Sequence, residues 1–204
     1  MTTYIPSLTL PAFIFENAAA SILLPIVLGT ASGYVITRPD KTKQQYGTFK
    51  KPVGSESGFE DVRRFPGNPP AWLFGPAWTA LYGFMGLSAH LAWTNGANSL
   101  SPATSSLAKQ GATLYTIQLG LNMLFMPLFF GYNRPVEALI DIVTLTGLNG
   151  WLIYVWGQVD QRSGWLLAPY LGWLSFATYL CAGTGYLNDW DLRNNSKSTI
   201  EKKD

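Results

Sequence analysis

The long middle of this chain, from Phe65 to Asn188, carries almost no charge. Its charged residues are only six: Lys109, Arg134, Glu137, Asp141, Asp160 and Arg162. In ordinary soluble domains about a quarter of the residues are charged, so this stretch could not build a water-facing surface. We therefore expect an integral membrane protein, and every later interpretation depends on that expectation.

Charged and loop-forming residues divide the chain into apolar segments. After Pro-rich and Asn/Gly/Ser-rich ends are removed, five remain: 18–37, 72–93, 112–131, 138–157 and 165–187. Each is near the roughly 20 residues that a helix needs to cross about 30 Å of hydrocarbon. None shows the alternation of a barrel strand, so we predict an all-α integral membrane protein, a five-transmembrane-helix bundle. Gly and Trp keep the mean hydropathy modest, and hydropathy alone understates these helices.

The basic residues predict the topology. Loop 38–71 carries seven Lys and Arg residues, the C-terminal tail carries four, and Arg134 adds one. The opposite side has only Lys109 and Arg162. By the positive-inside rule the richer side faces the cytosol. We thus predict a non-cytosolic N-terminal segment (1–17), a single membrane domain (18–187) with a long cytosolic loop (38–71), and a cytosolic charged tail (188–204).

The residues that usually carry soluble-enzyme chemistry are scarce. With one cysteine, Cys181, no intramolecular disulfide can form. The single histidine, His90, lies in a predicted span and is interpreted as a hydrogen-bonded packing residue. There is no zinc-ligand spacing and no phosphate-binding glycine loop. We expect no metal, no cofactor and no nucleic-acid partner.

Eight tryptophans are the most informative side chains. Trp93, Trp156 and Trp165 stand at span ends and are interpreted as interfacial anchors. Trp78 and Trp173 lie well inside their spans, so they need another explanation.

Three predicted helices carry interior faces of aromatic, small and amide side chains. Residues three or four apart share a face of a helix. The three faces are Trp78 with Tyr82, then Gln118, Asn122, Phe125 and Phe129, then Pro169, Trp173, Ala177 and Leu180. Such faces suit a cavity for a flat apolar ligand. Plain helix packing, with amides as interhelical glue, explains them equally simply, and composition alone favours it slightly.

Ordered motifs resemble a known family. The stretch Pro69-Pro70-Ala71-Trp72-Leu73-Phe74-Gly75-Pro76-Ala77-Trp78-Thr79-Ala80-Leu81-Tyr82 is similar to the second-helix signature of the translocator protein/tryptophan-rich sensory protein family, formerly the peripheral benzodiazepine receptors. Further matches follow in order: Leu114-Tyr115, Gln118-Leu119, Leu121-Asn122, Pro127, Phe129-Phe130-Gly131, Asp141, and the run from Pro169 to Thr178. The resemblance covers roughly residues 20–190 and implies five transmembrane helices.

The resemblance also implies a ligand site. Members bind porphyrins such as protoporphyrin IX, sterols, and synthetic isoquinoline or benzodiazepine ligands, in a cavity toward the cytosol lidded by the first loop. Trp78 and Trp173 match the pocket tryptophans of the family. Other pocket-lining positions match Phe74, Asn122, Phe125, Ile140, Thr144, Ala177 and Leu180. Some bacterial members are reported to degrade porphyrin photochemically, with the two tryptophans implicated.

The chain departs from the family pattern at three places. The proposed cholesterol motif is absent as usually written, because the first basic residue after Tyr186 is Arg193. Glu137 replaces a helix 4 pocket tryptophan of mammalian members, which predicts weak binding of synthetic ligands. The first loop is longer near 54–64, which predicts a different lid.

Two polar or small-residue patterns leave alternatives open. Arg134, Glu137 and Asp141 have the spacing of an ion-pair ladder, or of a polar mouth for a ligand head group. The stretch Gly29–Gly33 is a GxxxG, and Ala112, Thr116 and Gly120 repeat small residues every four positions, so either is a candidate seam of a homodimer.

Three function classes follow. We favour a membrane receptor or translocator for tetrapyrroles, with sterols or other lipids as further candidate ligands. A light- and oxygen-dependent porphyrin-modifying enzyme is the first alternative, and a small-molecule transporter is the second. For a eukaryotic member, the resemblance implies the outer mitochondrial membrane.

Overall fold

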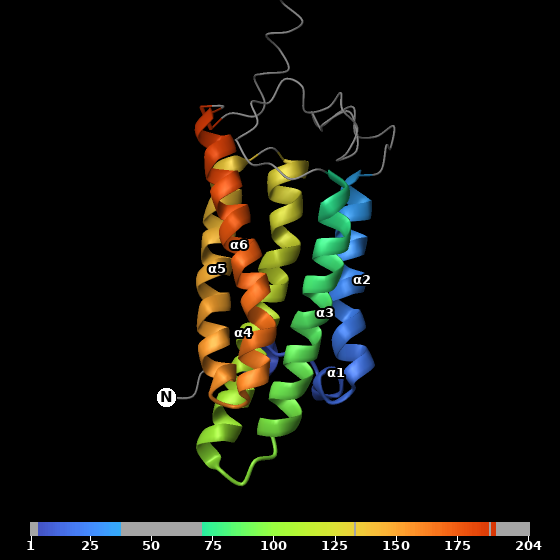
Figure 1. Ribbon diagram of the computed structural model, residues 1–204, viewed down its shortest axis with the longest axis vertical. Helices are drawn as coiled ribbons and strands as arrows, with labels where there is room; N and C mark the ends of the chain where they lie inside the picture. The colour runs from blue at the N-terminus through green and yellow to red at the C-terminus, as the bar shows by residue number, and fades with distance from the viewer. Residues whose placement is uncertain (1–3, 38–70, 133, 188, 191–204) are drawn as a thin grey trace, which may run out of the picture.

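The protein is described by a computed structural model, which covers residues 4–37, 71–132, 134–187 and 189–190. Five long helices lie side by side with their axes roughly aligned and form a bundle (Figure 1). They are α2 (Ala18–Thr37), α3 (Ala71–Gly96), α4 (Pro102–Met126), α5 (Pro135–Gly157) and α6 (Gln161–Leu187). No strand occurs in these ranges. The predicted all-α, five-helix membrane bundle is confirmed.

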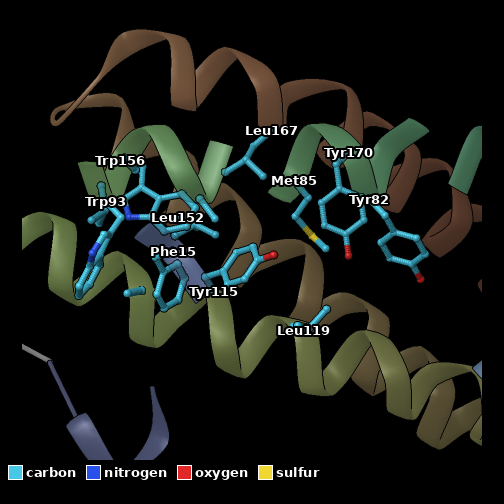
Figure 2. Packing of buried hydrophobic residues seen from close by; sticks show 14 of the residues in the cluster. Phe15, Tyr82, Met85, Trp93, Tyr115, Leu119, Leu152, Trp156, Leu167 and Tyr170 are labelled. Carbon is cyan, nitrogen blue, oxygen red and sulfur yellow. The ribbon is translucent and has the colours of Figure 1, made fainter. Parts of the chain in front are cut away.

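The helices close into a ring. Helix α2 packs on α3, α3 on α6, α6 on α5, α5 on α4, and α4 back on α2, while α3 and α4 also touch inside the ring. Residues that face inward are fully buried, among them Met85, Leu145, Leu152 and Leu174. Figure 2 shows part of this interior, where aromatic rings pack against one another and against aliphatic side chains.

Three of the helices are long and apolar enough to cross a membrane by hydropathy. They cover Pro102–Gly131, Pro135–Gly157 and Gln161–Leu187, and a shorter apolar stretch spans Ala18–Ser32. Helix α3 has no charged residue, but its Trp, Tyr, Gly and His residues lower its mean hydropathy. The expectation that hydropathy alone understates these helices is therefore confirmed.

Helix α4 begins ten residues before the predicted span 112–131. The Ser101 side chain accepts a hydrogen bond from the backbone of Thr104 at 3.4 Å, and Pro102 fills the first helical position. This cap starts the helix in a stretch whose Ser and Asn content predicted a loop. At its other end α4 continues as the π-helix η3 (Pro127–Gly131), since Pro127 interrupts the regular hydrogen bonding.

An N-terminal strap, residues 5–16, crosses the end of the bundle where α3 joins α4. It contains the 3₁₀-helix η1 (Pro6–Leu8) and the short helix α1 (Ala12–Glu16), and α1 lies at the base of the bundle in Figure 1. Thr113 accepts a hydrogen bond from the Ile5 amide at 3.1 Å, and Thr116 accepts one from the Leu10 amide at 3.0 Å. Two hydroxyls of α4 thus hold the backbone of the strap.

Phe15 fixes the strap to the core. Its side chain is fully buried, stacks on Trp93 with ring centroids 5.1 Å apart, and meets Tyr115 edge-on at 5.8 Å. His90 Nδ1 lies 2.8 Å from the Phe15 carbonyl oxygen. The interpretation of His90 as a hydrogen-bonded packing residue is confirmed.

The interpretation of Trp93 and Trp156 as interfacial anchors is wrong. Trp156 is 1% exposed, its ring lies 5.5 Å from that of Tyr115, and its indole nitrogen lies 3.4 Å from the Ala108 carbonyl oxygen. The indole of Trp156 fits against α4 only because residue 111 is glycine, since any Cβ there would collide with the indole. The early start of α4 and the strap extend the core past both tryptophans. Trp165 differs, since it is 70% exposed at its span end, as an anchor requires.

Several small residues of the two candidate dimer seams make contacts within the bundle itself. A Cβ at Gly29 would collide with the Tyr82 ring, so Gly29 serves the packing of α2 on α3. Ala112 is buried and Thr116 binds the strap. Gly120 is exposed, with open space around its Cβ position. A homodimer stays a prediction.

Candidate ligand-binding site

An aromatic cluster forms where α3 faces α6. Helix α3 presents Phe74, Trp78 and Tyr82 at four-residue spacing, and α6 presents Tyr170 and Trp173 three apart. Ring centroids are 5.9 Å apart for Phe74 and Trp173, 6.3 Å for Trp78 and Trp173, and 6.3 Å for Trp78 and Tyr170. All three pairs meet edge-to-face, the arrangement that aromatic quadrupoles prefer.

The cluster has a polar floor made by three helices. The Tyr82 hydroxyl donates to Asn122 Oδ1 at 2.7 Å, and Asn122 Nδ2 donates to the Tyr170 hydroxyl at 2.7 Å. All three residues are buried. One amide on α4 thereby links α3 to α6 through hydrogen bonds.

The cluster offers an apolar, aromatic face to a ligand. Trp78 and Trp173 are half-buried, so part of each indole stays accessible beside the fully packed core. The phenol groups of Tyr82 and Tyr170 are already bonded to Asn122, and no formal charge lies within the cluster. Such a surface suits a flat ligand held by stacking and van der Waals contact.

The other predicted pocket residues differ in how deeply they are buried. Phe125 is half-buried on α4 and stacks on Phe129 at 5.7 Å. Ala177 and Leu180 are half-buried on α6, one and two turns beyond Trp173. Ile140 and Thr144 lie on the exposed face of α5, and Thr144 donates to the Ile140 carbonyl. The assignment of all five to a pocket stays a prediction.

Asp141 does not join a ladder with Arg134 and Glu137. Arg134 and Glu137 form an exposed ion pair at 3.1 Å, whereas Asp141 is 6% exposed and neither of its carboxylate oxygens has a hydrogen-bond partner in the described residues. The spacing of three and four residues suggested one face. Packing of α5 between α4 and α6 turns Asp141 inward instead.

Sequence reasoning missed Tyr170 as a site residue. It stands three residues before Trp173 within the motif that begins at Pro169, so helical spacing could have placed it on the same face. The predicted lid, loop 38–71, and its insertion near 54–64 lie outside the described residues, apart from Ala71 at the start of α3. In the described residues no group of His, Cys, Asp and Glu is arranged to hold a metal ion.

A family model described as TspO/MBR family matches residues 21–187, which is most of the chain. The match covers α3 to α6 in full and α2 from Ser21 onward. The chain belongs to the TspO/MBR family. The match contains the whole aromatic cluster and its polar floor. The resemblance inferred from the motifs is confirmed, and membership supports a role as a membrane translocator or receptor.

Three named relatives of this TspO/MBR protein come from organisms that are only distantly related to one another. A "Translocator protein homolog" of Schizosaccharomyces pombe is 38% identical over 175 residues, covering 86% of this chain and 94% of the relative. A "Tryptophan-rich protein TspO" of Archaeoglobus fulgidus is 35% identical over 162 residues, covering 79% and 90%. The "Translocator protein" of Homo sapiens is 37% identical over 113 residues, covering 55% and 64%.

Proposed function

We propose that this TspO/MBR protein is a membrane receptor or translocator that binds tetrapyrroles of the protoporphyrin IX type at the aromatic cluster. Sterols or other lipids are further candidate ligands. The observation that carries the proposal is the edge-to-face contact of two half-buried indoles, Trp78 and Trp173, at 6.3 Å. A planar macrocycle can stack on such rings, and the Tyr82–Asn122–Tyr170 floor limits how deep it enters.

We place loop 38–71 and the C-terminal tail in the cytosol, and a eukaryotic form in the outer mitochondrial membrane. The helix ends that carry these segments, at Thr37, Ala71 and Leu187, lie at one end of the bundle (Figure 1). Arg134, between α4 and α5, belongs to the same end. Twelve of the fourteen basic residues therefore belong to segments that adjoin the helices at this end. Ligand would then enter the cluster from the cytosolic half of the bundle.

The binding test uses tryptophan replacements in the purified protein. We expect Trp78→Phe and Trp173→Phe each to weaken protoporphyrin IX binding by about 1 kcal/mol, which is about fivefold in Kd, because an aromatic pair contributes that much. Absorbance titration of the porphyrin measures Kd. Trp165→Phe, at an exposed span end, is the control and should bind as the wild type does. An unchanged Kd in the double variant would move the porphyrin away from this cluster.

A porphyrin-modifying reaction is the second candidate, favoured by the same indole pair. Light-excited porphyrin can take an electron from an adjacent indole, which then loses its N–H proton, and dioxygen can add to the resulting macrocycle radical. Dioxygen is then the oxidant, and the addition consumes the porphyrin. With porphyrin in excess, we expect no loss in darkness and loss of about one porphyrin per protein under light, as a binding site with a photochemical side reaction gives. Sustained multiple turnovers in darkness would show an enzyme instead.

A further inference from the structure

From the level of the Tyr82–Asn122–Tyr170 floor toward the strap end, the bundle interior contains buried polar groups without hydrogen-bond partners among the described residues. Tyr115, Gln118 and Asn149 are each at most 1% exposed. The Tyr115 hydroxyl, Gln118 Oε1 and both amide atoms of Asn149 have no hydrogen-bond partner among the described residues. Gln118 Nε2 donates to Met85 Sδ at 3.0 Å, and a thioether is a weak acceptor.

The register of the helices brings these groups to neighbouring levels. Tyr115 and Gln118 are three apart on α4 and share a face. The ring centroids of Tyr115 and Trp156 of α5 are 5.5 Å apart. Helices α4 and α5 follow one another in the chain after a short connection and pack antiparallel. Asn149 lies seven residues from Trp156, and Asn122 lies seven from Tyr115, about 10 Å along the bundle in both cases. Asn149 is therefore level with Asn122 and one turn from Gln118.

Unpaired amides inside a membrane bundle are costly. A buried amide or hydroxyl without a partner gives up its hydrogen bonds to water and gains none in return. The unpaired groups here are neutral donors and acceptors: an amide NH₂, two amide oxygens and a phenol. The set has no charge to attract an ion. A buried water typically makes about three hydrogen bonds to such groups.

We propose that Tyr115, Gln118 and Asn149 form an internal water-binding site, the inner polar site, between the aromatic cluster and the N-terminal strap. The Met85 side chain, which Figure 2 shows between Tyr115 and Tyr170, forms its wall. Water here satisfies the amides and offers Asn122 alternative hydrogen bonds when Tyr82 or Tyr170 moves. The inference does not depend on which ligand binds the aromatic cluster.

X-ray hydroxyl-radical footprinting of the full chain in lipid nanodiscs tests the site. Radicals formed from an internal water attack the side chains beside it. Met85 and Tyr115, 0% and 1% exposed, should be oxidised at doses that label the exposed Trp165. If both stay unlabelled in the wild type, the inner polar site is dry and the proposal is overturned.

Variants identify the groups that hold the water. In Asn149→Leu the labelling of Met85 and Tyr115 should fall several-fold, while labelling of Trp165 and Tyr186 stays constant. Leu145→Ile, one turn away on the same buried face, is the matched control and should label as the wild type does. Gln118→Leu removes the other amide and serves if Asn149→Leu does not fold. Unchanged Met85 labelling in a folded amide variant would overturn the assignment.

Discussion

At the scale of single residues, Asn122 links three helices. Its one side chain bonds Tyr82 of α3 and Tyr170 of α6 at 2.7 Å each, and its own backbone belongs to α4. Interhelical hydrogen bonds in membranes average only about 0.6 kcal/mol. Their loss costs more when buried partners are left unpaired, because each orphaned group then loses its solvation as well.

Replacement of Asn122 by Leu should show this asymmetry. Two buried phenols lose their partner, and at roughly 1–3 kcal/mol for each unpaired group we expect a loss of about 2–6 kcal/mol in unfolding free energy. The triple variant Asn122→Leu, Tyr82→Phe, Tyr170→Phe removes all the polar atoms together and should be more stable than Asn122→Leu alone. Thermal unfolding in detergent measures both. A triple variant less stable than the single variant would contradict this explanation.

At the scale of elements, the α2–α3 pair contains a close approach of the two backbones. A Cβ at Gly86 would lie 2.6 Å from Ile22 Cα and also strike the Ser21 carbonyl, so the two backbones pack directly. Gly83, three residues earlier on α3, has nothing within 4 Å of its Cβ position. Close helix packing therefore requires glycine at position 86 but not at position 83.

The two glycines predict opposite effects of alanine. Gly86→Ala should push α2 from α3 and destabilise the bundle, because the obstructing atoms are backbone and cannot rotate away. Gly83→Ala should be neutral or stabilising by up to about 1 kcal/mol, the helix-propensity difference. Urea or thermal unfolding of both variants measures this. Equal stability of the two would show that α2 can shift at no cost.

The strap is the other element whose attachment can be tested. Phe15→Ala empties a fully buried aromatic site, and such replacements cost roughly 3–5 kcal/mol. We expect the strap to detach, with faster amide hydrogen exchange over residues 12–16. Phe13→Ala is the matched control on the same short helix, since Phe13 is 61% exposed. Equal exchange in the two variants would mean that Thr113 and Thr116 hold the strap without Phe15.

At the scale of the whole molecule, the ring of helices brings together, at one end, the helix ends that flank the basic segments in the sequence. Ends of α2, α3 and α6 meet there, while the turn between α3 and α4 lies at the other end (Figure 1). An odd number of crossings puts the two termini on opposite sides. By the positive-inside rule, the charge bias predicts that the end with the basic segments faces the cytosol.

Cysteine labelling in sealed vesicles of known orientation tests this topology. In a Cys181→Ser background, Glu56→Cys and Ser198→Cys should react only from the cytosolic side. Asn98→Cys, exposed in the α3–α4 turn, should react only from the other side. Reaction of positions 56 and 198 from different sides would refute the odd number of spans.

The sequence alone determined the membrane environment, the five helices and the faces of α3 and α6, because these depend on local charge and on helical spacing. Phe74, Trp78 and Trp173 could be placed together from spacing and motif alone, and they do meet. Only the tertiary structure decided the burial of Trp93 and Trp156, the inward turn of Asp141 and the anchoring of Phe15. Each of these depends on contacts between segments far apart in the chain, and the strap bonds to α4 across more than a hundred residues. Local spacing carries no information about such partners.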